Sequence, residues 1–541
     1  MVESIAELHD EDTLQPSDKQ KPHACQIVAI RTNSKGEKVK NEVSNDDDDK
    51  EDDEKDESAL YSFQFEKDKL SSILRAVPAD MPVAVVSVVG AFRTGKSFLL
   101  SWFLRYLTYQ QEQGTKGGSE ARKWYESFDA LGTDDGFEWK AGSERHTTGI
   151  WIWSEPFFLE TAVDGKRKKV AVLLVDTQGM FDHETTMALT ASIFGFSTLL
   201  SSYQIYNVDK RIQEDNLQQL ALFSEYARTA VASNDDRKDD KNDGKDDDDD
   251  DGNDRKKSPR RKPFQHIEFL VRDWQHFEDD DSDDVDNMDF DKIERDMQEY
   301  LDKVLQEREA KDLKDTREQI ASCFEQTTCY GFCHPGFAVT KKKYKGDVKD
   351  LEPLFLRLLD RYCHRVFSPA SLQPKVIHGR QLSARELGTY IEAYAELFTA
   401  GTSFPTAATM LEATASANNT NAVNLASLKY KETMDLVAGP KCSSYLQPEE
   451  LRKEHAKAVK ESLLVFESIA NFGNRTSINE ARDAVTNYTK SNYEVYVSLN
   501  DGRNPLKGLE TYVSCLAPLT KREFVKANRN LTLPFLSFPV L

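Results

Sequence analysis

The chain has 541 residues and a formal net charge of −22, so it is long enough for two or more domains. This acidic balance excludes nucleic acid as the main partner, because a phosphate backbone requires a basic surface. Seven cysteines and no recognisable signal peptide predict free thiols in a cytosolic setting.

The N-terminal part of the chain divides into a polar tail and a mixed domain. Residues 1–58 are charged and lack periodicity, which predicts a disordered acidic tail. From 59 to 400, buried strands alternate with helices, and this pattern predicts a mostly parallel sheet with helices on both faces, an α/β fold. The predicted strands are Val83–Val89, Lys169–Val175, Ile267–Val271 and Thr327–Phe332. The predicted helices are Phe98–Tyr109, Thr185–Ser201 and Gln213–Val231.

A charged insert and a helical region complete the chain. The insert, at about 233–262, predicts a disordered surface loop, with a regulatory or docking loop as the alternative. A predicted hinge at 401–405 precedes Ala-rich helical patterns over 406–505, which predict an antiparallel helical bundle. Residues 506–541 form a tail. No stretch in it approaches the roughly 20 apolar residues of a transmembrane helix.

A phosphate-binding pattern follows the first predicted strand. Its residues fit G-x-x-x-x-G-K-[ST]: Gly90, Ala91, Phe92, Arg93, Thr94, Gly95, Lys96 and Ser97. The glycines let backbone N–H groups turn toward phosphate oxygens, and the next helix points its positive end at them, so Phe98 belongs to the site too. We expect Lys96 to neutralise the β and γ phosphates, and Ser97 to bind Mg²⁺.

Further motifs complete a nucleotide site. Asp176-Thr177-Gln178-Gly179 follows the second predicted strand; Asp176 is expected to hold the Mg²⁺ shell and Gly179 to offer its N–H to the γ-phosphate. Between this motif and the phosphate loop, Thr147 is the preferred candidate to complete the Mg²⁺ shell. An ordinary threonine turn is the alternative reading of that segment.

The base-reading residues are less obvious. The common Asn/Thr-Lys-x-Asp motif is absent where it is expected, and Arg272-Asp273-Trp274 stands after the third predicted strand. A carboxylate there accepts two hydrogen bonds from guanine but is poorly paired with adenine, so the residues favour guanine and leave adenine open. Cys329, Cys333 and His334 make a weak case for structural zinc, which needs four ligands.

Six motifs in order then resemble the atlastins, dynamin-like GTPases related to guanylate-binding proteins. They are GAFRTGKSFLL, GSERHTTGIWIWSE, VAVLLVDTQGMFD, FLVRDW, CHPG and MLEATASANN, within residues 61–500. The resemblance implies GTP hydrolysis with Arg93 as an internal arginine finger, Thr147 as a switch threonine and Arg272-Asp273 as the guanine-specifying pair. It also implies that His334-Pro335-Gly336 begins a loop that caps the base.

The resemblance further implies a mechanical role. In that family GTP drives G domains to dimerise, the bundle docks about the hinge, and two endoplasmic reticulum membranes are tethered and fused. Atlastins continue into a transmembrane hairpin, which this sequence does not show. Two alternatives therefore stand beside fusion at the cytoplasmic face of the reticulum: a cytosolic, non-fusing regulator that pairs with membrane-anchored relatives, and a guanylate-binding-like oligomerising protein. The expected partners are GTP and GDP, a second copy or a relative, and the membrane indirectly.

Overall fold

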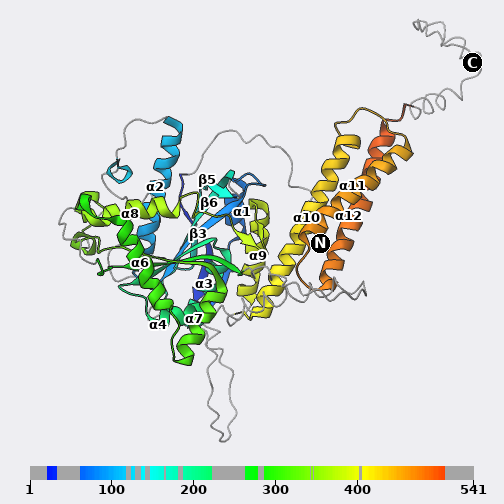
Figure 1. Cartoon of the computed structure of the whole chain (residues 1–541). Helices are drawn as coiled ribbons and strands as arrows, with labels where there is room; N and C mark the ends of the chain where they lie inside the picture. Colours follow the sequence, from blue (N-terminus) through cyan, green and yellow to red (C-terminus); the bar gives the residue numbers. More distant parts are fainter. Residues whose placement is uncertain are drawn as a thin grey trace, which may run out of the picture. The chain divides into compact units, whose positions relative to one another are not determined.

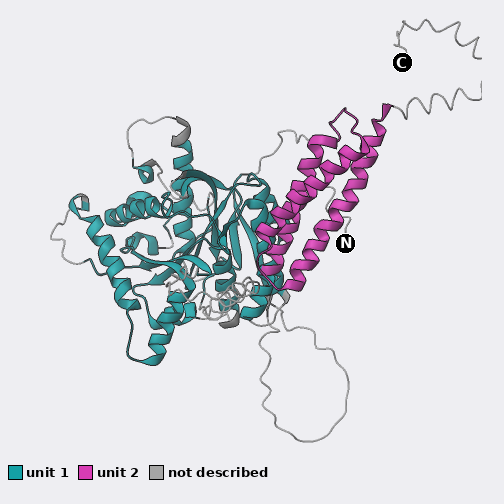
Figure 2. Ribbon diagram, turned by 45° about the vertical axis from the view of Figure 1, so that its right-hand side comes forward, with its two compact units in different colours: residues 1–414 teal, residues 415–541 magenta. Residues whose placement is uncertain are grey.

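The computed structural model describes two compact units, Met1–Thr414 and Ala415–Leu541 (Figure 2). The described residues are 21–32, 61–116, 123–127, 136–139, 147–163, 166–180, 187–221, 262–277, 285–341, 343–344, 346–400 and 405–505. The charged insert up to residue 261 and the tail 506–541 lie outside these ranges, as do residues 401–404 of the predicted hinge.

Unit 1 is built on a nine-stranded sheet in the order β2-β1-β4-β6-β3-β7-β8-β9, with β5 also paired to β6. The pairs from β6 through β9 are parallel, and the remaining pairs are antiparallel. The strands are β1 Ala24–Thr32, β2 Tyr61–Phe65, β3 Val83–Gly90, β4 Ile150–Trp153, β5 Phe157–Val163, β6 Lys166–Thr177, β7 Tyr203–Asp209, β8 Phe264–Arg272 and β9 Phe324–Gly331. A short hairpin pairs β10 Val376–Ile377 with β11 Arg380–Gln381.

Helices cover this sheet on both faces (Figure 1). Phe103 of α2 packs on Tyr362 of α8 with ring centroids 5.9 Å apart, and Phe196 of α3 packs on Phe398 of α9 at 5.6 Å. The helices of the unit are α1 Lys67–Arg75, α2 Lys96–Lys116, α3 Met187–Leu200, α4 Glu214–Ala221, α6 Phe290–Leu305, α7 Lys311–Cys323, α8 Pro353–Val366 and α9 Ala384–Ala400. The predicted α/β fold is confirmed.

The four predicted strands are present as β3, β6, β8 and β9. The prediction of disorder for the whole of 1–58 is wrong for β1, which pairs with both β2 and β4. Ile27 and Val28 are 1% and 2% exposed. Strand pairing and burial outweigh the polar composition of the surrounding sequence, because strand formation depends mainly on neighbours.

Unit 2 contains the predicted helical bundle. Its helices are α10 Ala407–Ala438, which begins in unit 1 and continues past the boundary between the units, α11 Pro448–Ile469 and α12 Arg475–Gly502. One apolar cluster gathers around Ala422, Ala426 and Phe466, and a second includes Tyr430 and Tyr496. Among the described helices, none combines the length and apolar character needed to cross a membrane.

Candidate nucleotide-binding site

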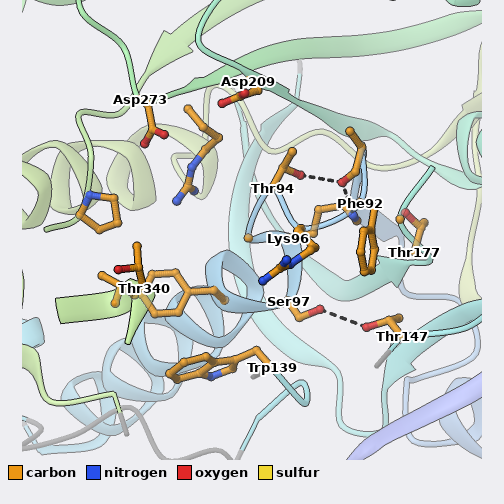
Figure 3. A pocket seen from close by; sticks show the side chains of 18 of the residues that line it. Phe92, Thr94, Lys96, Ser97, Trp139, Thr147, Thr177, Asp209, Asp273 and Thr340 are labelled. Carbon is orange, nitrogen blue, oxygen red and sulfur yellow. Dashed lines mark hydrogen bonds between the residues drawn. The ribbon is translucent and has the colours of Figure 1, made fainter. Parts of the chain in front are cut away.

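The phosphate-loop pattern begins at Gly90, the last residue of β3, and ends with Lys96 and Ser97, the first residues of α2 (Figure 3). Gly90 and Gly95 have φ values of 148° and 82°, in the range that favours glycine. A side chain on Gly90 is excluded, because its Cβ would lie 2.2 Å from the carbonyl oxygen of Asn207 on β7. Arg93 adopts φ 63° although it is not glycine, so the surrounding structure must hold this turn in place.

Lys96 is a buried cation where the loop enters α2. It is 6% exposed, and its Nζ donates a hydrogen bond of 2.9 Å to the carbonyl oxygen of Ala91. The hydroxyl of Thr94 donates to the same oxygen at 2.9 Å. Burial lowers the pKa of Lys96 to about 8, and the Asp176 carboxylate opposes this shift. A buried ammonium group that donates to a neutral carbonyl is suited to an incoming anion.

All three predicted metal ligands come together beside this lysine. The Ser97 hydroxyl donates to Asp176 Oδ2 at 2.6 Å and lies 3.3 Å from the hydroxyl of Thr147. Burial raises the pKa of Asp176 to about 6, although the Ser97 hydrogen bond and Lys96 lower it. Asp176 Oδ1 is buried and has no hydrogen-bond partner among the described residues. These oxygen atoms fit a hard divalent cation such as Mg²⁺.

Gly179 fixes the end of β6 against the phosphate loop. A Cβ at Gly179 would lie 2.6 Å from Phe92 Cα. Next to it, the Met180 N–H donates to Gly90 O at 3.1 Å, and the Phe92 N–H donates to Met180 O at 2.8 Å. The structure therefore brings Gly179 to the phosphate loop, as the sequence predicts.

Arg272 is the last residue of β8, and Asp273 follows it. A Cβ on Gly95 would lie 3.5 Å from Arg272 Nη2, so the Arg272 side chain reaches the phosphate loop. Arg272 is 7% exposed, and its guanidinium lies over the rings of Phe332 and Phe355 at 5.3 and 5.9 Å. Burial lowers the pKa of Arg272, and its Nη1 has no hydrogen-bond partner within the described part of the chain. Asp273 takes φ 54° and lines the cavity.

A cavity of about 540 Å³ extends from the phosphate loop to Asp273. In Figure 3, Asp209 and Asp273 lie on one side of it and Trp139 on the other, with Lys96 between them. Ala91, Phe92, Arg93, Thr94, Gly95, Lys96, Ser97, Phe98, Thr147, Gly179, Arg272 and Asp273 all line it. His334 and Pro335, expected from the family resemblance, line it as well.

Sequence reasoning missed several lining residues. Glu138 and Trp139, the Asp209 at the end of β7, and Val339 and Thr340 of the 3-10 helix η4 (Phe337–Thr340) all contribute to the wall. Recognising β7 as a strand would have pointed to Asp209, because the carboxyl ends of parallel strands meet at one edge. Across the described residues, no group of three or more His, Cys, Asp or Glu is arranged to hold a metal ion, so the zinc alternative gains no support.

Comparisons with known proteins agree with this geometry. The family described as "Guanylate-binding protein, N-terminal domain" matches residues 61–376. Atlastin-1 of Bos taurus is 34% identical over 452 residues, which are 82% of this chain and 71% of the relative. The chain belongs to the atlastin family of GTPases.

Other atlastins match to a similar extent. Atlastin of Drosophila melanogaster is 34% identical over 464 residues, 84% of this chain and 77% of the relative. Atlastin-3 of Homo sapiens is 35% identical over 459 residues, with coverage of 83% and 75%. Each of these matches is longer than the region 61–376 that the family model covers, so the similarity to atlastins extends beyond the guanylate-binding domain.

Proposed function

We propose that this atlastin-family chain binds GTP with Mg²⁺ in the cavity between the phosphate loop and Asp273, and hydrolyses it there. The observation that carries the proposal is the cluster of Ser97, Asp176 and Thr147 beside the buried Lys96. Such a cluster supplies both a cation site and a counter-charge for the terminal phosphates. Membership of a GTPase family supports the same reaction.

The phosphate end performs the chemistry in this proposal. Lys96 exchanges the carbonyl of Ala91 for oxygens of the β and γ phosphates, and the Gly179 N–H donates to the γ-phosphate. The exposed Arg93 stabilises the negative charge that develops on the transferring phosphoryl group. Ser97, Thr147 and, through water, Asp176 would hold Mg²⁺, which neutralises phosphate charge when bound.

The opposite end selects the base. The Asp273 carboxylate accepts hydrogen bonds from the N1–H and N2–H₂ groups of guanine. The Arg272 guanidinium is held over the rings of Phe332 and Phe355, and its positive charge interacts with the Asp273 carboxylate. His334 and Pro335 close the wall around the base.

We further propose that GTP turnover drives pairing of G domains, in a homodimer or with a related atlastin. The bundle then rearranges about the hinge at 401–405, and the stroke organises or fuses membranes at the cytoplasmic face of the endoplasmic reticulum. The support is similarity to atlastins over more than four fifths of the chain. A non-fusing regulator of related atlastins and a guanylate-binding-like oligomerising protein are the alternatives.

The test compares Arg93→Ala with Arg167→Ala, an exposed arginine of β6 that pairs with Glu160. Arg93→Ala should slow phosphate release on the order of 100-fold or more and change GDP affinity far less. The Arg167 variant should match the unaltered protein. Equal losses in turnover and affinity would reduce Arg93 to a binding contact.

Sedimentation tests the pairing in the same samples. We expect a monomer with GDP and a dimer with a transition-state mimic of GTP. A monomer in every nucleotide state rules out the homodimer. Sedimentation of a mixture with a related atlastin then tests the mixed pair, and the absence of that pair rules out the regulator alternative as well. Flotation with liposomes then separates a membrane-bound protein from an unattached one.

A further inference from the structure

One buried amide on β7 touches the phosphate loop and belongs to no motif in the sequence. Asn207 is 0% exposed. Its Nδ2 donates a hydrogen bond of 3.0 Å to the carbonyl oxygen of Thr94. Because a carbonyl can only accept, the amide nitrogen must be the atom that faces Thr94.

The same residue also contacts the beginning of the loop. Asn207 and Gly90 are paired in the parallel ladder between β7 and β3. The backbone oxygen of Asn207 lies close to Gly90. A Cβ on Gly90 would be only 2.2 Å from this oxygen, so no side chain fits there. Asn207 therefore touches the loop where it leaves the strand and again near where it enters α2.

Arg93 lies between two fixed points on this loop. On one side, the Phe92 N–H donates to Met180 O at 2.8 Å. On the other, Thr94 O accepts from Asn207. Arg93 itself has φ 63°, and a left-handed conformation costs a residue with a side chain about 1 kcal/mol or more. Contacts to its neighbours must therefore hold that conformation.

We propose that Asn207 is a positioning residue, which holds the carbonyl group of Thr94, the residue after Arg93, so that the Arg93 side chain is directed at the transferring phosphoryl group. The inference rests on the role proposed for Arg93. Asn207 does not line the cavity, so it acts through the loop and not on the nucleotide. Misplacing a catalytic group by about 1 Å can slow a reaction on the order of 100-fold.

The test uses Asn207→Leu, which keeps the branched shape and the number of heavy atoms but removes the donor, and Asn207→Ala, which avoids overpacking because the methyl groups of leucine are larger than the amide. Turnover number should fall about 10- to 100-fold, while GDP affinity and KM change less than about threefold. The double variants combine each Asn207 change with Arg93→Ala. Their turnover should be no slower than that of Arg93→Ala alone, because Asn207 acts only by placing the Arg93 side chain.

A control separates positioning from general loss of stability. Gln204 is a second buried amide on β7, and its side chain bonds to Thr198 and Ser197 of α3, which are not part of the phosphate loop. Gln204→Leu should lower the thermal unfolding midpoint but leave turnover unchanged. An equal loss of turnover in this variant overturns the inference.

The remaining outcomes distinguish the inference from the proposed function. If Arg93→Ala slows turnover but neither Asn207 variant does, the inference is wrong and the role of Arg93 stands. Losses that multiply in the double variant also overturn it, because Asn207 then acts independently of Arg93. If Arg93→Ala leaves turnover unchanged, the proposed role of Arg93 fails first.

Discussion

Lys96 and Asp176 show how single residues prepare this site for its ligand. Both are nearly inaccessible to solvent. Burial disfavours the charged form of each group, so the pKa of Lys96 falls to about 8 and that of Asp176 rises to about 6. Two charges held in this way gain more from a phosphate and a cation than exposed charges do, because their hydration is already lost.

Asp273 carries the prediction on base selection. Asp273→Asn replaces one acceptor oxygen with an NH₂ group, which faces the donor edge of guanine unfavourably. The preference for GTP over ATP should fall by a factor on the order of 10 to 100. Competition binding with the two nucleotides measures it, and hydrolysis of bound GTP should persist. Unaltered selectivity would assign base reading to another group, such as Asp209 on the same wall.

Lys375 gives a prediction on pH, because it is 2% exposed and its Nζ donates to Ser201 O at 2.8 Å. Burial lowers its pKa from 10.5 to about 7. Between these values the unfolded chain binds a proton that the folded chain does not, so stability rises with pH across this window. Below about pH 7 the cost of burying the charge is fully present.

Lys375→Met removes this titration. The stability of the unaltered protein relative to the variant should therefore increase by about 1 kcal/mol or more between about pH 7 and about pH 9.5. Thermal unfolding at the two pH values measures the difference. Lys168→Met, at an exposed position on β6, is the control and should show no such change. If the stability difference between the unaltered protein and Lys375→Met stays constant with pH, burial of Lys375 does not lower its pKa.

At the scale of elements, β1 stabilises both the sheet edge and the segment that carries Thr147. The side chain of Gln26 donates to Thr148 O at 2.8 Å. Gly149, with φ 75°, lies so close to Val28 O that a Cβ would be 1.9 Å from it. Strand β1 therefore supports the backbone that presents Thr147 to Ser97.

Two N-terminal deletions test this role. Removing residues 1–58 eliminates β1 and the burial of Ile27 and Val28, each about 1.5–3 kcal/mol. We expect a clearly lower unfolding midpoint and slower GTP turnover. Removing residues 1–20 leaves every described contact in place and should change neither. If the two deletions give the same unfolding midpoint and the same GTP turnover, β1 contributes nothing to stability or to the site.

The contrast between β3 and β7 explains which elements could be predicted. β3 is a continuous apolar run that is buried along its whole length, so its sequence alone indicates a strand. β7 contains Gln204 and Asn207, whose burial depends on hydrogen bonds to Thr198 and Thr94. Likewise, the local phosphate-loop motif was predictable, whereas Trp139 and Asp209 reach the cavity only through the tertiary fold.

At the scale of the whole molecule, the nucleotide site and the bundle belong to separate compact units. The residues that line the cavity all belong to unit 1. The bundle has its own two apolar clusters, in which small side chains bring helices close together. Ala426 of α10 is 0% exposed, and its carbonyl oxygen accepts from Ser462 Oγ of α11 at 2.7 Å.

Ala426→Leu tests whether the two units fold separately. The larger side chain overpacks the contact between α10 and α11, at a cost of about 1–3 kcal/mol. Calorimetry should show a lower bundle transition, while the G-domain transition and the basal GTP turnover stay unchanged. Ala456→Leu, at an exposed position on α11, should leave both transitions in place. If Ala426→Leu lowers both transitions together, the bundle is part of the folding unit that forms the nucleotide site, and a freely moving bundle is excluded.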